Sequence, residues 1–441
     1  MTGKIGGQEF PAARGNILIE GIRSRGRTVD VFVDGEGRIA TMGGGAGRSL
    51  RRDAEIRIDG TRQILIPGLV NTHTHAAMTL MRGYADDMPL QEWLERKIWP
   101  LEAHLTGEDV FQGTRLACLE MIRSGTVAFN DMYFFMEEAA RAVKEMGLRA
   151  TLAYGFIDLG DPERREREVK ATGRFVSAVK AMAEPRIQAA VGPHAPYTVS
   201  PEGLRWCAGY AGEEGIGIHT HLAETEQEVR DSVKMHGKRP AAHLDACGCL
   251  TGRTVAAHCC WLDRDECALL AARGASASHN PTSNMKLAVN RAMPYPWMKE
   301  AGVNVTLGTD GCASNNSLDM FGAMKDAALL QKFAWNTQTL LPAPEVLGMA
   351  TEAGGRALGI PTGRIETGAP ADLVLVNMAT APMTPLFSEE SNLVYSARGS
   401  AVDTVICDGR ILMLHGRVPG EEEILAGAAS AAAALVRRSI A

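Results

Sequence analysis

Two regions, one near each end of the chain, consist of short apolar runs that are interrupted by glycine and aspartate. They cover residues 17–66 and 363–418. Apolar runs separated by turn residues are typical of antiparallel strands. An Ala-rich stretch at 425–437 follows the second region and predicts a closing helix. We expect segments 1–66 and 363–441 to share one small β-sandwich.

The middle of the chain alternates between short β-branched apolar runs and long amphipathic stretches. This alternation is typical of βαβ units that build a parallel sheet. The runs are ILIPGLVNTHTH, TVAFNDM, RATLAYGF, RIQAAVGPHAP, GIGIHTHLAET, TVAAHCCWL, ASASHNPTSN and VNVTLGTDG. Eight strands of this kind predict an α/β fold, a TIM-like (β/α)8 barrel over residues 67–362.

Polar residues gather where these predicted strands end. Six of the eight runs, all but the second and third, end in His, Asp or Glu. The carboxyl ends of barrel strands form the mouth at which barrel enzymes carry out their chemistry. The pattern therefore predicts an active site at this mouth.

Composition and charge narrow the class of protein. The 441 residues are 45% hydrophobic and 22% charged, which is ordinary for a globular protein. The net charge of −6 offers no basic excess for nucleic acid. The start MTGKIGGQEF does not resemble a secretory signal, and no long apolar span follows. We expect a cytoplasmic protein without membrane contact, whose nine cysteines are reduced and packed.

Four strand-end residues form a candidate metal site. His73 and His75 stand two apart, so the period of a strand points both toward the barrel axis. His221 on the fifth run and Asp310 on the eighth add a nitrogen and a hard oxygen. Three histidines and one carboxylate suit Zn²⁺ or Fe²⁺ with an open position for water. For H-x-H alone, a hydrogen-bonded histidine pair is the alternative.

This set resembles the amidohydrolase superfamily, whose members carry H-x-H after strand 1, His after strands 5 and 6, and Asp after strand 8. The resemblance spans nearly the whole chain. Two-metal members carry a Lys or Glu at the end of strand 4, whereas VGPHAPYT here has neither, which implies one divalent ion, zinc or alternatively iron. The superfamily ligand directly precedes Leu-Ala-Glu-Thr, which favours His221 over the inward-facing His219.

One reaction that such a metal site could support is hydrolytic deamination of a purine. This reaction needs a metal-activated water, a base that takes the proton of the water, and an acid that protonates the ring nitrogen N1. Glu224 is the candidate proton shuttle, and a solvated carboxylate at a helix start is the alternative reading. His258 resembles the superfamily histidine that orients the water, and Asp310 is both a ligand and an assisting base. His194 ends the fourth run and is a candidate contact for the purine or for the departing ammonia.

Six blocks of sequence resemble the methylthioadenosine/S-adenosylhomocysteine deaminase family. They are residues 71–106, GPHAPYT, HLAET, AHCCWL, SHNPTSNMKL and TLGTDGCASNN. The resemblance implies hydrolytic removal of the 6-amino group of methylthioadenosine, S-adenosylhomocysteine or adenosine, which gives the inosine analogue and ammonia. It also implies that Glu102 binds the ribose 2′- and 3′-hydroxyls, since a carboxylate accepts two hydrogen bonds. Trp93 and Trp99 wall the nucleoside or pack the loop.

The 5′ substituent is the point at which the chain departs from some members of this family. Those members use an arginine at the end of strand 3, and another in the next loop, for the homocysteine carboxylate. Tyr154 stands near the first position, and Arg164 and Arg165 are the nearby loop cations. We therefore predict that methylthioadenosine is turned over at least as well as S-adenosylhomocysteine.

Two other functions stay open at this point, as does a homo-oligomeric state. The first is an amidohydrolase that acts on guanine, cytosine or an s-triazine, and a substrate panel distinguishes it. The second is a non-catalytic barrel protein with a role in assembly, which the complete ligand set disfavours. The zinc fold of cytidine deaminases is excluded, because it requires a C-x-x-C pair that this chain lacks.

Overall fold

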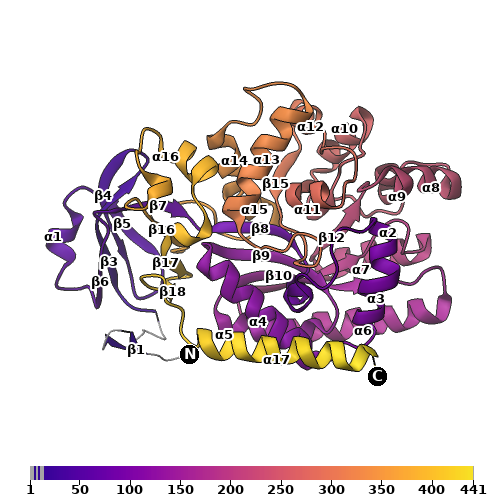
Figure 1. Cartoon of the computed structure of the whole chain (residues 1–441), viewed down its shortest axis with the longest axis horizontal. Coiled ribbons are helices and arrows are strands. Elements are labelled where there is room, and N and C mark those ends of the chain that lie inside the picture. The colour runs from indigo at the N-terminus through magenta and orange to yellow at the C-terminus, as the bar shows by residue number, and fades with distance from the viewer. Residues whose placement is uncertain (1–3, 6–7, 10–13, 441) are drawn as a thin grey trace.

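The computed structural model describes residues 4–5, 8–9 and 14–440. A barrel occupies most of the molecule, a mixed sheet lies at one end of it, and helix α17 (Glu421–Ile440) runs along its side (Figure 1). The segment on which we based the expected lack of a secretory signal lies largely outside the described residues. No described helix is long and apolar enough to cross a membrane.

All eight predicted barrel strands are present, and they pair side by side in chain order. They are β8 (Leu69–Thr74), β9 (Thr126–Tyr133), β10 (Arg149–Phe156), β11 (Ile187–Pro193), β12 (Gly217–Leu222), β13 (Thr254–His258), β14 (Ser276–His279) and β15 (Asn304–Leu307). Neighbouring strands are parallel throughout. Beside the metal site, the amide of Asp310 donates to the carbonyl of His73 over 2.9 Å and joins the last strand to the first.

Amphipathic helices cover the outside of the barrel. In α5, buried Met136, Ala139, Ala140, Val143 and Met146 recur at the spacing of one helical face. The helices are α4 (Gly107–Arg123), α5 (Met136–Met146), α6 (Pro162–Met182), α7 (Pro201–Glu214), α8 (Glu226–His236), α9 (Pro240–Ala246), α10 (Arg264–Arg273), α11 (Pro281–Lys286), α12 (Tyr295–Ala301), α13 (Met320–Ala334), α14 (Ala343–Met349) and α15 (Glu352–Leu358). The predicted closing helix is confirmed as α17, which packs along α4.

A helical excursion follows β8 and stands at the end of the barrel away from the mixed sheet (Figure 1). Its elements are η1 (Ala76–Met81), α2 (Leu90–Trp93), η2 (Leu94–Ile98) and α3 (Trp99–Glu102). Short helices between the last strands of the mixed sheet are η3 (Ala381–Met383), α16 (Glu389–Ser391), η4 (Asn392–Ser396) and η5 (Gly399–Ala401). The helical excursion after β8 thus lies at the end of the barrel where it can cover the carboxyl ends of the strands.

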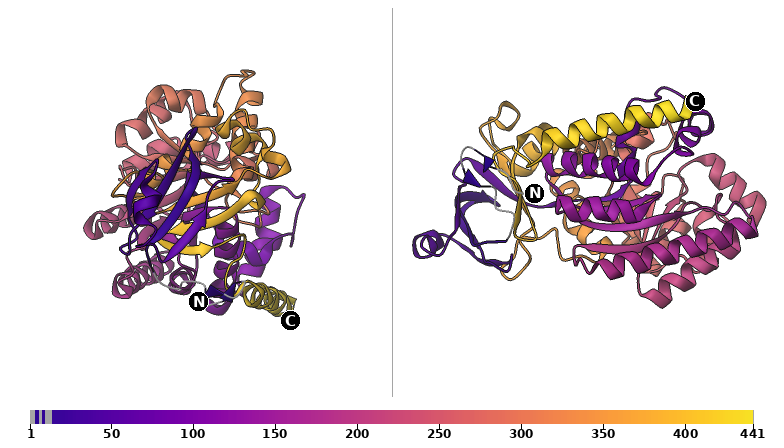
Figure 2. Two further views of the ribbon diagram at one scale, coloured as in Figure 1. Left: turned by 90° about the vertical axis from the view of Figure 1, so that its left-hand side faces the viewer. Right: turned by 90° about the horizontal axis from the view of Figure 1, so that it is seen from below.

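The two ends of the chain share one β-structure, as the sequence predicts (Figure 2). It is a mixed sheet rather than an antiparallel one, because β3 pairs in parallel with β6 and with β7. Its strands are β3 (Ile17–Ser24), β4 (Arg27–Val33), β5 (Ile39–Gly43), β6 (Ile56–Asp59), β7 (Gln63–Pro67), β16 (Leu373–Asn377), β17 (Val402–Cys407) and β18 (Arg410–Met413), with α1 (Ala46–Leu50) beside them. The N-terminal strands β3 to β6 join the others through the β3–β7 pairing of Arg23 with Ile64 and through a bridge between Arg38 and Pro370 just before β5. Both halves contribute to one apolar core, which includes Ile19, Leu65 and Ile406.

One predicted run serves two sheets. The run ILIPGLVNTHTH contains β7, which pairs with β16, and β8, which belongs to the barrel. Gly68 separates them, and a Cβ atom there would lie 2.2 Å from Val127 Cγ2. Only glycine therefore fits where the chain passes from one sheet to the other. We propose the domain boundaries close to this change of sheet, with the barrel at 67–362.

The structure places the cysteines in the packed interior, as the sequence predicts. All nine are free and buried, and burial raises the pKa of Cys249 and Cys267 to about 12. Their thiols therefore stay protonated and unreactive near neutral pH.

Candidate active site

A cavity of about 530 Å³ opens at the carboxyl ends of the barrel strands, beneath the helical excursion. Among the predicted site residues, its lining includes His75, Glu102, Arg164, His194, His221, Glu224, His258 and Asp310. Each of these residues follows or ends a barrel strand, except Glu102 and Arg164, which come from α3 and α6. The folded chain thus gathers at one mouth the side chains that the strand ends predict.

The four predicted metal ligands converge on one point. The Nε2 atoms of His75 and His221 lie 3.2 Å apart, and the Nε2 atoms of His73 and His75 each lie 3.3 Å from Asp310 Oδ1. Tetrahedral zinc, with bonds of about 2.0–2.1 Å, has ligand-to-ligand edges of about 3.3 Å. His73 Nε2 is buried without a hydrogen-bond partner among the described residues. In the described part of the chain, two groups of side chains could hold a metal ion, His73 with His75 and His221, and His73 with His258 and Asp310. Because the two groups share His73, the four predicted donors suit one divalent ion, with His258 beside them.

The other nitrogen of each histidine is held by a protein group. His75 Nδ1 donates to the carbonyl of Met132 over 2.7 Å, and His221 Nδ1 donates to the carbonyl of His194 over 2.7 Å. His73 Nδ1 lies 2.7 Å from His219 Nε2. Such contacts fix the ring orientation and leave Nε2 free for a metal. His219 thus contacts the ring of the candidate ligand His73.

Two serines that we did not predict hold Asp310. Ser283 Oγ and Ser314 Oγ donate to Asp310 Oδ2 over 2.6 and 2.8 Å. This leaves Oδ1 facing His73 and His75. Both serines lie in motifs that carry the family resemblance, but the motifs alone do not show which oxygen each hydroxyl contacts.

Glu224 and His258 stand side by side next to the metal set. Glu224 Oε1 lies 3.6 Å from His258 Nδ1, and the side-chain amide of Asn284 donates to the same nitrogen over 2.9 Å. Burial, reinforced by the nearby Asp310, raises the pKa of Glu224 to about 8. Burial lowers the pKa of His258 to about 4. Near neutral pH the pair therefore consists of a carboxyl that holds a proton and an uncharged imidazole.

Glu102 forms a second acidic point in the cavity. Burial raises its pKa to about 7, against the opposing effect of a hydrogen bond that Tyr133 Oη donates over 2.6 Å. Tyr133 also lines the cavity, as do Trp93 and Trp99. Sequence reasoning missed Tyr133, although it ends β9. A carboxylate between aromatic walls can accept hydrogen bonds from a vicinal diol.

The structure separates the two candidate arginines. Arg164 lines the cavity, with its Nε 3.9 Å from Glu168 Oε1. Arg165 is absent from the described lining and instead lies 3.4 Å from Ser200 Oγ and 3.9 Å from Asp158 Oδ2. Tyr154, expected beside the 5′ substituent, hydrogen-bonds Glu168 and leaves Gly155 to line the cavity. Only Arg164 thus remains a candidate partner for a charged 5′ group.

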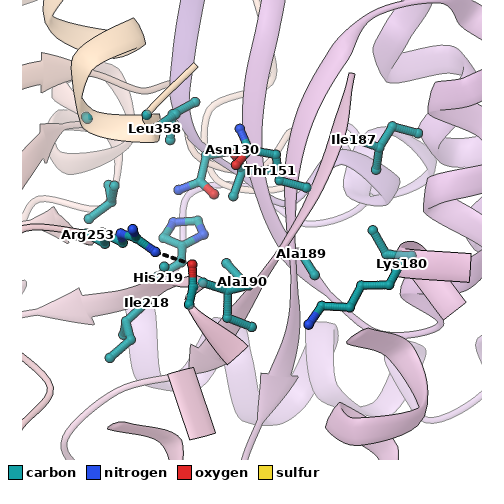
Figure 3. A pocket seen from close by; sticks show the side chains of 18 of the residues that line it. Asn130, Thr151, Lys180, Ile187, Ala189, Ala190, Ile218, His219, Arg253 and Leu358 are labelled. Carbon is teal, nitrogen blue, oxygen red and sulfur yellow. Dashed lines mark hydrogen bonds between the residues drawn. The ribbon is translucent and has the colours of Figure 1, made fainter. Parts of the chain in front are cut away.

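Figure 3 shows a second cavity, of about 610 Å³. It lies at the amino-terminal end of the barrel, because its lining includes Ile187 and Gly217, which begin β11 and β12. Asn130, Thr151 and His219 line its interior, while Lys180 and Arg253 line its outer part. No cluster of candidate metal ligands among the described residues opens into it. Because barrel enzymes place their chemistry at the opposite end, we assign the active site to the first cavity.

Comparisons with known proteins agree with this geometry. A sequence profile described as "Amidohydrolase family" matches residues 64–412. The chain is 61% identical over 424 residues to a 5′-deoxyadenosine deaminase of Methanoregula boonei, which covers 96% of each chain. It is 51% identical over 388 residues to 5-methylthioadenosine/S-adenosylhomocysteine deaminase 1 of Archaeoglobus fulgidus, which covers 88% of this chain and 90% of the relative.

A solved structure matches the whole architecture. The adenosine deaminase of Xanthomonas campestris, described with bound zinc, superposes with a TM-score of 0.89 at 36% sequence identity. The match covers 97% of this chain and 100% of that one. The chain belongs to the amidohydrolase family.

Proposed function

We propose that this chain is a metal-dependent deaminase that removes the 6-amino group of adenosine-type nucleosides. The products are the inosine analogue and ammonia. One observation carries the proposal: a single cavity is lined by three of the four candidate metal ligands, His75, His221 and Asp310, together with Glu224 and Glu102. The names of the relatives support the same substrate class.

We propose that His73, His75, His221 and Asp310 hold one zinc ion, with iron as the alternative. The zinc described in the related adenosine deaminase supports this choice. When bound, the ion would lower the pKa of a water molecule so that the water can attack C6 of the purine. Ser283 and Ser314 support this set by holding the far oxygen of Asp310.

Glu224 and His258 then handle the protons. Glu224 is protonated near neutral pH and lies beside the ligand set, so it donates a proton to purine N1 and recovers one from the water. His258 is uncharged, and its Nδ1 accepts a hydrogen bond from the side-chain amide of Asn284, so its Nε2 carries the hydrogen and can orient the water by donating to it. Asp310 assists as a base, and His194 contacts the purine or the ammonia.

Glu102 selects the nucleoside. Its carboxylate accepts hydrogen bonds from the ribose 2′- and 3′-hydroxyls, and Trp93 and Trp99 form the walls beside it. Much of the remaining lining is apolar and includes Leu90, Leu94, Ile98, Phe134, Ile157 and Leu159. A small uncharged 5′ substituent fits such walls, as in 5′-deoxyadenosine or methylthioadenosine. Guanine, cytosine and s-triazines have no ribose diol for Glu102 to bind.

Product analysis tests the proposal. Zinc-loaded enzyme incubated with methylthioadenosine should release one ammonia per inosine analogue formed. A chelator should abolish this reaction, and added zinc should restore it. If the loaded protein deaminates guanine but leaves adenosine-type nucleosides intact, the alternative heterocycle is its substrate. If it turns over neither class, the non-catalytic reading stands.

A further inference from the structure

A buried carboxylate holds the backbone that carries Glu224. The turn from β12 to α8 passes through Ala223, which has a φ of +48°, a left-handed conformation that non-glycine residues rarely adopt. Glu228 Oε1 accepts a hydrogen bond from the amide of Ala223 over 2.7 Å, and its Oε2 accepts one from the amide of Glu224 over 2.9 Å. Glu228 is only 5% exposed. Both of its oxygens are thus committed to this turn.

The reach of Glu228 differs from that of an ordinary helix cap. In a capping box, the third helical residue accepts a hydrogen bond from the amide of the N-cap residue. Glu266 in α10 does this, accepting from the amide of Asp263 over 3.2 Å. In α8 the N-cap is Thr225, yet Glu228 reaches past it to the two preceding amides. The Glu228 carboxylate therefore binds the backbone of Glu224, the residue that lines the candidate active site.

The side chain of Glu224 is not held by comparable hydrogen bonds. Among the described residues, no group donates a hydrogen bond to its carboxylate, and the nearest charged or ionisable partner is His258 Nδ1 at 3.6 Å. Since no hydrogen bond from a described residue fixes the carboxylate, its position depends more strongly on where the backbone of Glu224 is held. The carbonyl of Ala223 also accepts a hydrogen bond from the amide of Trp261 over 2.8 Å, so the turn is held from both sides.

We propose that Glu228 is a positioning residue that acts on the reaction only through Glu224. Its two hydrogen bonds hold the left-handed turn and aim the Glu224 carboxyl into the cavity. The cost of placing a second carboxylate in this buried region supports a specific role, because burial raises the pKa of Glu228 to about 7. The inference rests on the proposed role of Glu224 in deamination.

A double-substitution cycle tests this role. Glu228→Gln replaces one carboxylate oxygen by an NH₂ group, which then faces the backbone N–H of Ala223 or of Glu224. We expect kcat for methylthioadenosine to fall about 10- to 100-fold, while KM changes by less than about threefold. In a Glu224→Gln background, the same change should alter kcat by less than about twofold, since two residues that act as a unit are not additive. Multiplicative losses, or wild-type kcat in Glu228→Gln, would overturn the proposal.

Controls separate positioning from folding. Glu266→Gln alters a similarly buried carboxylate that caps α10 and also accepts hydrogen bonds from Arg239 and from the amide of Ala241, so it should lower thermal stability and leave kcat unchanged. Glu228→Asp keeps the charge but shortens the reach, and it should lose kcat in the same way as Glu228→Gln. Equal kcat losses in Glu266→Gln and Glu228→Gln would mean a merely structural role.

A readout without substrate distinguishes this inference from the proposed function. Amide hydrogen exchange at Ala223 and Glu224 should become faster in metal-loaded Glu228→Gln, while exchange at β13 stays as in the wild type. Unchanged exchange at the turn would refute the positioning role even if the wild type deaminates nucleosides. If exchange at the turn becomes faster but the wild type deaminates no nucleoside, the role of Glu228 in holding the turn stands and the proposed function is refuted.

Discussion

Arg164 is the one arginine or lysine among the described residues that line the cavity, and it gives a prediction about the 5′ substituent. Its one ion pair with a described residue is to Glu168, with 3.9 Å between the nearest atoms. Its guanidinium is thus free to pair with the amino-acid carboxylate of S-adenosylhomocysteine, which methylthioadenosine lacks. We predict that Arg164→Ala lowers kcat/KM for S-adenosylhomocysteine and leaves kcat/KM for methylthioadenosine unchanged.

The magnitude follows from the exposure of the side chain. A hydrogen bond between charged groups contributes about 1.5–3 kcal/mol when it is shielded. The Arg164 side chain is 36% exposed, and solvent screening reduces the contribution to about 1 kcal/mol. This corresponds to about a fivefold loss of kcat/KM. So small a gain also explains why methylthioadenosine should remain at least as good a substrate in the wild type.

Steady-state kinetics with both substrates decide the matter, and Arg165→Ala is the matched control. Arg165 contacts Asp158 and Ser200 outside the cavity, so its loss should affect both substrates equally, if at all. The reasoning fails if Arg164→Ala harms both substrates alike, or if Arg165→Ala selectively harms S-adenosylhomocysteine. A wild type that clearly prefers S-adenosylhomocysteine would also contradict it.

Three further predictions concern the metal, the protons and the ribose. Elemental analysis should find about one divalent ion per chain in the wild type, and this ion should be lost in His221→Ala. Two ions per chain, or full metal content in His221→Ala, would count against the ligand set. Glu224→Gln should keep the metal and lose about 10²–10⁴-fold in turnover, with a similar loss in His258→Ala, and near-normal deamination in either variant refutes its role. The Glu102 carboxyl gains a proton below a pKa of about 7 and then accepts the ribose hydroxyls less well. The ratio of kcat/KM for adenosine to kcat/KM for 2′,3′-dideoxyadenosine should therefore fall as the pH drops through 7. A ratio that does not change with pH would exclude Glu102 from ribose binding.

Most of the candidate metal site could be predicted from the sequence, because strand-end position and spacing bring its residues together. His73 and His75 share a face through the two-residue period of a strand. His221 and Asp310 meet them because all parallel strands of a barrel end at the same mouth. The barrel strands were predictable for the same reason, since each is a short apolar run between amphipathic helices.

Features that depend on packing between distant segments could not be predicted. The change of sheet at Gly68 is invisible within one continuous apolar run, since it results from the approach of Val127. Tyr154 and Gly155 face opposite sides of β10, and the sequence does not reveal which side meets the cavity. The hydrogen bond from Tyr133 to Glu102 joins β9 to α3 across the mouth, a contact that no local motif records.

The central claim is that this cavity deaminates adenosine-type nucleosides, and one comparison of kcat/KM tests it most directly. The substrates are methylthioadenosine, 5′-deoxyadenosine, adenosine, S-adenosylhomocysteine and guanine, each assayed with the zinc-loaded enzyme. We predict turnover of all four nucleosides, with methylthioadenosine and 5′-deoxyadenosine at least equal to S-adenosylhomocysteine, and negligible turnover of guanine. Preferential turnover of guanine, or no turnover of any nucleoside by fully loaded enzyme, would contradict the account.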